Sequence, residues 1–143
     1  MKTEFWCMGK TEEPYLKEGI GQYARRLSHY LNFEYRELTG KDKEKEIEKF
    51  LKTNDYLVLL DERGQEFTSR GLSQFLQQRF NTGSGRLIFL AGDAYGFPEA
   101  VSERANFRLA LSLLTFTHEM VRLIFLEQLY RAMTILKNEN YHH

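Results

Sequence analysis

The chain has 143 residues, of which 42% are apolar and 28% are charged, which suits one globular domain and argues against intrinsic disorder. Twenty basic and twenty acidic residues cancel, so the net charge gives no sign of the long-range positive field of many nucleic-acid-binding proteins. The single cysteine, Cys7, cannot form an internal disulfide, the start is too polar for a signal peptide, and no apolar run approaches the length of a membrane span. We therefore expect one domain over 1–143 in a cytoplasmic protein that does not enter membranes.

The first half of the chain alternates strands with helices. Residues 2–8 are expected to form a strand rich in aromatic and sulfur-containing side chains, and Thr11 could cap the amphipathic helix that follows. The segment 31–38 alternates apolar and polar residues as a half-exposed strand does, and 41–52 is typical of a charged helix with one apolar stripe. The continuous apolar run 56–60 indicates a strand that is covered on both faces.

The second half continues this alternation. The polar stretch 61–71 is expected to be a loop, and apolar residues at helical spacing over 72–80 predict a helix. A buried strand, a short helix, a last strand and a closing helix are then expected at 86–92, 98–105, 107–112 and 119–137. The whole pattern predicts an α/β fold with a mostly parallel sheet and helices on both faces.

The closing helix has apolar side chains on nearly every side, although it also carries polar residues at i,i+4 spacing, such as Glu127 and Arg131. A helix that is apolar all round must be covered all round. A monomer of this size can hardly cover a peripheral helix in this way, so we predict a homodimer packed through it. His118 and Arg122 share one face near the start of this helix, where a histidine can be either functional or purely structural.

Ligands of open α/β sheets bind beyond the carboxyl ends of the strands. Three predicted strand ends are therefore candidate ligand-binding positions, at Leu60-Asp61, at Gly92-Asp93 and at Leu111-Ser112. The segment "AGDAYG" over 91–96 has glycines that would let the backbone approach a ligand, although a simple strand-ending turn explains it as well. It is neither a dinucleotide-binding fingerprint nor a phosphate-binding loop, and no G-x-S-x-G turn supports serine catalysis. The cysteine and histidines lack zinc-site spacing, so no metal is expected.

Several motifs in a fixed order resemble the RlmH methyltransferases, small members of the SPOUT class. That family places a T-[FL]-P-H-x-x-x-R stretch before an E-x-x-Y-R-A helix and a Y-H tail. The matching residues here are Thr115-Phe116-Thr117-His118, Arg122, Glu127, Tyr130-Arg131-Ala132 and Tyr141-His142. The resemblance continues upstream through "VLLDERG" and "LIFLAGDAYGF" to the first residues, so it covers essentially the whole chain.

The resemblance implies a C-terminal trefoil knot, although threaded chains are otherwise nearly absent from proteins. It also implies that S-adenosylmethionine binds among the loops at the three strand ends chosen above. The cofactor-binding residues are then expected to be Leu60, Gly92, Leu111, Ser112, Leu113, Leu114, Thr115 and Phe116. The implied reaction is methyl transfer to N3 of a pseudouridine in the 23S RNA of the bacterial large ribosomal subunit.

By the same resemblance, four residues carry the chemistry. His118 would act as a base or hydrogen-bond the target base, and Arg122 would hold phosphate or stabilise a deprotonated ring. Tyr141 and His142 would reach the target pocket, which they could do across the dimer. The chain departs from the family pattern at Asp93, where a second glycine is usual, and at Thr117, where proline is usual. An aspartate at 93 could attract the cofactor's positive charge or narrow its pocket.

The expected partner is the assembled ribosome, because a neutral chain without an added RNA-binding domain would recognise a preformed surface rather than attract free RNA. Two alternatives stay open. The chain could be a knotted dimeric binding module without activity, which would not bind S-adenosylmethionine. It could also be a SPOUT methyltransferase that acts on another RNA, such as a transfer RNA.

Overall fold

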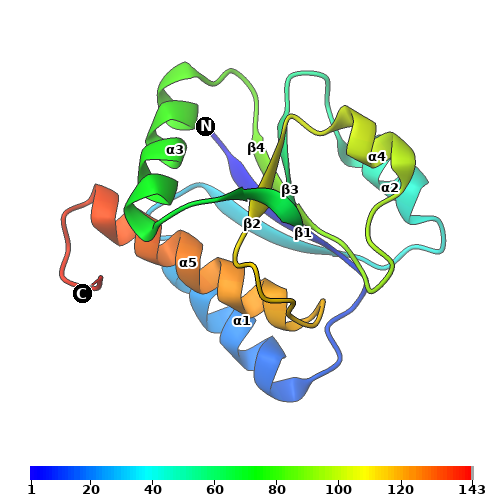
Figure 1. Cartoon of the computed structure of the whole chain (residues 1–143), viewed down its shortest axis with the longest axis horizontal. Coiled ribbons are helices and arrows are strands. Elements are labelled where there is room, and N and C mark those ends of the chain that lie inside the picture. The colour runs from blue at the N-terminus through cyan, green and yellow to red at the C-terminus, as the bar shows by residue number, and fades with distance from the viewer. Residues whose placement is uncertain (143) are drawn as a thin grey trace.

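A computed structural model describes residues 1–142 as alternating strands and helices around one sheet (Figure 1). The strands are β1 (Thr3–Met8), β2 (Phe33–Leu38), β3 (Tyr56–Glu66), β4 (Leu87–Ala91) and β5 (Phe107–Ala110). The helices are α1 (Pro14–Leu27), α2 (Lys43–Phe50), α3 (Ser69–Thr82), α4 (Glu99–Arg104) and α5 (Met120–Leu136). None of the described helices is both long and apolar enough to cross a membrane.

The five strands form a parallel sheet in the order β2-β1-β4-β3-β5. Helices α1, α3 and α5 cover one face, and α2 and α4 cover the other (Figure 1). Because side chains alternate across a strand, Phe5 and Cys7 of β1 enter the first core while Trp6 and Met8 enter the second. The predicted α/β class, parallel sheet and two-faced coverage are confirmed.

The polar stretch after the third strand was expected to be a loop, but residues 61–66 continue β3. After an irregularity between Leu60 and Gln65, the strand pairs with β5 a second time, with Gln65 opposite Leu109. Gly64 permits this return, because a Cβ there would lie 2.5 Å from the carbonyl carbon of Arg108. A polar strand without alternating apolar residues has no burial pattern, so only the partner strand reveals it. The threading of the C-terminal segment stays a prediction.

Helix α5 lies across the first face between α1 and α3 (Figure 1). One protomer already buries Phe125, Leu126 and Leu129 completely, while Leu123 and Ile124 on its outer side are only partly covered. The single chain therefore covers more of this helix than its composition suggested, because both neighbouring helices and the sheet contact it. The homodimer stays a prediction.

Candidate active site

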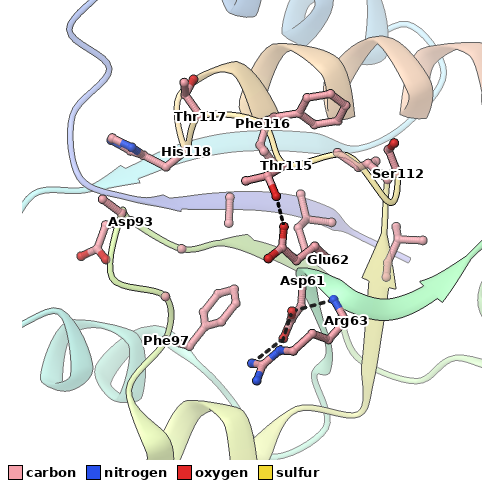
Figure 2. A pocket seen from close by; sticks show the side chains of 18 of the residues that line it. Asp61, Glu62, Arg63, Asp93, Phe97, Ser112, Thr115, Phe116, Thr117 and His118 are labelled. Atoms are coloured by element: carbon pink, nitrogen blue, oxygen red, sulfur yellow. Dashed lines mark hydrogen bonds and ion pairs between the residues drawn. The ribbon is translucent and has the colours of Figure 1, made fainter.

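A cleft of about 740 Å³, within the usual range for ligand pockets, opens beside the irregular part of β3 and the carboxyl ends of β4 and β5 (Figure 2). The topology explains its place. After β1 and after β3, the chain crosses to the face of the sheet that α1 and α3 cover. Strand β4 lies between these two strands, and after β4 the chain crosses to the opposite face, which α4 covers. Connections that diverge from neighbouring strands leave a crevice, which is where open α/β sheets bind ligands.

Seven of the eight residues expected to bind the cofactor line this cleft. They are Leu60, Gly92, Leu111, Ser112, Leu114, Thr115 and Phe116. Leu113 is the exception, because its side chain is 81% exposed and does not line the cleft. The structure thus brings together three positions that are far apart in the sequence: Leu60, where the pairing of β3 with β5 is interrupted, and Gly92 and Leu111, which directly follow β4 and β5.

The turn after β4 is tightly fixed. The Asp93 carboxylate accepts a hydrogen bond of 2.8 Å from the Tyr95 amide, and the Gly96 amide donates to the Asp93 carbonyl oxygen at 3.1 Å. Gly96 has a φ of 89°, which favours glycine. A Cβ at Gly92 would lie 2.8 Å from the Gly96 carbonyl oxygen, so only glycine fits there without moving the turn. Asp93 therefore serves the turn with one of its carboxylate oxygens.

The extension of β3 supplies charged groups to the opposite wall. Asp61 accepts hydrogen bonds from the backbone and guanidinium of Arg63, and Arg108 lies 3.8 Å away. Burial opposes ionisation of Asp61, but the bonds from Arg63 prevail and hold its carboxyl pKa below the ordinary value. Glu62 accepts a 2.7 Å hydrogen bond from Thr115, which joins this wall to the 111–118 segment (Figure 2).

The segment 111–117 has no regular structure, so its backbone groups are free of a sheet ladder. The Ser112 hydroxyl accepts from the Leu114 amide at 3.0 Å. Thr117, at the position where proline was expected, accepts from the Met120 amide at 3.2 Å and so caps α5, as its side chain allows. His118 follows directly and lines the cleft at the end near Asp93 (Figure 2).

Arg122 was expected to contact the substrate, but it does not line the cleft, and its side chain is fully buried. Its guanidinium donates to the carbonyl oxygens of Met8 (3.1 Å) and Gly9 (3.0 Å) at the end of β1, and to the Thr11 hydroxyl (2.7 Å). Glu37 lies 3.5 Å away and accepts from the same hydroxyl. Arg122 thus ties the start of α5 to the sheet.

Thr11 does not cap α1 as expected, because its hydroxyl belongs to the Arg122 and Glu37 contacts. The Glu119 carboxylate instead accepts from the amides of Glu12 (2.8 Å) and Glu13 (3.2 Å) just before α1. Burial opposes its ionisation, yet these two bonds hold the carboxyl pKa of Glu119 below its ordinary value. Two residues that follow His118, Glu119 and Arg122, are therefore fastened to the end of β1 and the region after it.

The tail residues lie at the other end of α5 from the cleft, and neither lines it (Figure 1). The Tyr141 hydroxyl is 3.2 Å from Glu127 and 3.3 Å from Tyr23, and the ring of Tyr141 packs edge-on against Tyr130. Burial, with these two neighbours, raises the pKa of Tyr141 above its ordinary value, so the phenol stays neutral. His142 Nδ1 is 3.1 Å from Arg131.

Asp61, at one of the three predicted strand ends, lines the cleft, but sequence reasoning missed Glu62, Arg63 and Phe97 as lining residues. Glu62 and Arg63 lie in the stretch that was assigned to a loop, although their place just after a buried apolar run was a usable signal. Burial raises the pKa of Cys7 to about 12, so its thiol stays protonated at neutral pH. Among residues 1–142, no group of three or more His, Cys, Asp or Glu side chains is placed to hold a metal ion.

Comparisons with known proteins agree with this geometry. The family model described as predicted SPOUT methyltransferase matches residues 1–142. A protein of Cytophaga hutchinsonii named ribosomal RNA large subunit methyltransferase H is 51% identical over the full length of both chains. Its namesake from Parabacteroides distasonis is 47% identical over all of this chain and 99% of its own.

Two solved structures share the fold. A probable methylase family protein from Haemophilus influenzae has a TM-score of 0.57 at 11% identity, covering 99% of this chain and 70% of its own. A probable methyltransferase from Bordetella pertussis has a TM-score of 0.54 at 9% identity, covering 92% of this chain and 94% of its own. The family match over the whole described chain, with end-to-end relatives near 50% identity, shows that this chain belongs to the SPOUT methyltransferases.

Proposed function

We propose that the chain transfers a methyl group from S-adenosylmethionine to N3 of a pseudouridine in 23S ribosomal RNA, acting on the assembled ribosome in the cytoplasm. One observation carries this proposal. The cleft collects seven of the eight expected cofactor residues together with His118, in a chain that aligns end to end with relatives named ribosomal RNA large subunit methyltransferase H.

The residues of the cleft fit this cofactor. Leu60, Leu111, Leu114 and Phe116 supply apolar walls for a planar base, and the irregular backbone of 111–117 offers amide and carbonyl groups to its edge. The lining carries three carboxylates, of Asp61, Glu62 and Asp93, but only one guanidinium, that of Arg63. An excess of negative charge favours a cationic ligand. The bound cofactor would supply a methyl group that is already activated on a positively charged sulfur.

The protein's own part is to align the two reactants and to assist loss of the imide proton from N3. His118 lies where the cleft meets the start of α5, so it is our candidate to accept that proton or to hydrogen-bond the ring. We expect His118→Ala to reduce kcat by about 100-fold or more, while calorimetry shows unchanged cofactor affinity. Full activity in this variant would exclude His118 from the reaction.

The tail can join this site only from a partner chain. α5 has 17 residues and is therefore about 25 Å long, with His118 before its start and Tyr141 after its end. We propose a homodimer in which Tyr141 and His142 of one protomer complete the cleft of the other. The exposed sides of α1 and α5 that the single chain leaves partly covered are the surface for this contact.

Mixed dimers test this arrangement. A His118→Ala protomer mixed with a His142→Ala protomer gives a heterodimer in which one cleft has both residues intact, provided that the tail acts across the dimer. Random mixing then restores about a quarter of the wild-type activity, since half of the dimers are mixed and each has one complete cleft of two. No gain on mixing would show that the tail serves its own chain or none.

The substrate is tested with ribosomes from a strain that lacks this gene. Purified protein is incubated with labelled cofactor and either large subunits, whole ribosomes, protein-free ribosomal RNA or transfer RNA, and the nucleosides are identified by mass spectrometry. We expect methylated pseudouridine from whole ribosomes and little product from protein-free RNA. Product from transfer RNA would reassign the target, and absence of heat on titration with S-adenosylmethionine would favour an inactive binding module.

A further inference from the structure

We propose that Tyr95 is an RNA-binding residue, whose ring stacks on a base next to the target nucleotide. The inference rests on the proposed function and adds a substrate contact to it. Tyr95 is 97% exposed, which makes it the most exposed large apolar side chain among residues 1–142. A single exposed apolar side chain is common on protein surfaces, but this ring stands on a fixed turn beside the candidate site, where an RNA base can stack on it.

The ring stands at the tip of the turn after β4, at the rim of the cleft. Asp93, Ala94 and Gly96, on either side of it in the chain, all line the cleft, whereas Tyr95 itself does not. Its position is fixed, because its own amide donates to the Asp93 carboxylate at 2.8 Å and Gly96 donates back to Asp93 at 3.1 Å. The ring is thus presented beside the cleft without a loss of backbone freedom on binding.

The surroundings favour a base as the partner. Because Tyr95 is 97% exposed, both faces of its ring are open to a planar group. The Asp93 carboxylate, which accepts from the Tyr95 amide, would repel a phosphate and so favours contact with a base over contact with the RNA backbone. A target base that enters the cleft from a folded RNA leaves its neighbour at the rim, and unstacked RNA bases commonly stack on aromatic side chains.

The composition gives a second reason. The chain has twenty basic and twenty acidic residues, so no overall field draws it to RNA. Affinity must then come from local contacts, and an uncharged aromatic side chain provides one by stacking on a base. A second copy of the chain could also cover Tyr95, but among residues 1–142 no other large apolar side chain of this turn is exposed, whereas a dimer interface usually has an apolar centre.

The test compares Tyr95→Ala, Tyr95→Phe and the control Gln74→Ala, which removes an exposed, uncharged side chain of α3 that lies outside both the cleft and the proposed dimer surface. We expect Tyr95→Ala to raise the KM for ribosomes and the Kd for their binding on the order of tenfold. Tyr95→Phe and Gln74→Ala stay within about twofold of wild type. Cofactor affinity by calorimetry is the same in all of them, because Tyr95 lies outside the cleft.

An unchanged KM and Kd for Tyr95→Ala, or an equal loss in Gln74→Ala, would overturn the inference. A weaker dimer in Tyr95→Ala by sedimentation would also overturn it and would assign the ring to a second copy. Ribosome binding is measured independently of methyl transfer, so the outcome separates the two proposals. Wild-type protein that binds ribosomes without methylating them contradicts the proposed function, while the Kd values still decide the role of Tyr95.

Discussion

Replacing Arg122 with methionine separates the role suggested by the sequence motif from the role given by the structure. The change keeps most of the apolar stem but removes the donors to Met8, Gly9 and Thr11. Loss of one partner from a buried charged pair costs about 3–5 kcal/mol. Glu37 keeps its hydrogen bonds from Thr11 and Tyr35 and is partly exposed, so the lower end applies, about 3 kcal/mol.

This loss lowers the melting temperature by roughly 10 °C for a chain of this size. Urea unfolding at one fixed protein concentration measures it, because any dimer makes the stability depend on concentration. The matched control is Arg36→Met, which removes the 2.8 Å pair with half-exposed Glu34 and should cost less than about 1 kcal/mol. If Arg122→Met kept wild-type stability and lost only activity, then Arg122 would act on the substrate and our assignment would be wrong.

Three further variants test the cleft and the core. Gly92→Ala places a Cβ 2.8 Å from the Gly96 carbonyl oxygen of the same turn, so we expect calorimetry to show cofactor binding that is weaker on the order of tenfold. The control Gly21→Ala should leave cofactor binding unchanged, because its Cβ would contact only the flexible side chain of Arg25. Thr115→Val removes the 2.7 Å bond to Glu62 and should weaken cofactor binding by several-fold, about 1 kcal/mol, with little change in the urea midpoint. Burial opposes ionisation of Asp55, but hydrogen bonds from the Arg86 side chain and from the amides of Lys52 and Arg86 hold its carboxyl pKa below the ordinary value. The ionised carboxylate therefore stabilises the fold above about pH 4, and this stabilisation is lost as the pH falls further. Asp55→Asn should have a lower free energy of unfolding than wild type at pH 7, and the difference between the two should disappear toward pH 2.

The candidate site shows where sequence reasoning succeeds. The ends of three predicted strands pointed to Leu60, Gly92 and Leu111, because carboxyl ends of parallel strands meet at one edge of a sheet. The residue pattern was less informative about side chains that act through distant partners. Arg122 follows His118 by one helical turn, but its guanidinium is held by the end of β1, more than 100 residues away in the chain.

The sequence by itself determined the class of fold, the alternation of elements and the edge of the sheet that holds the cleft. These features depend on the hydrophobic periodicity of each short segment and on the burial that it requires, and both are set by the local residues and not by distant partners. Only the tertiary structure decided that the polar residues after Leu60 pair with β5, and that the tail lies away from its own cleft. It also decided that Glu119, and not Thr11, accepts hydrogen bonds from the amides just before α1. These features depend on pairs of residues that are far apart in the chain. A residue that forms a hydrogen bond or an ion pair leaves no periodic pattern in the sequence from which its partner could be identified.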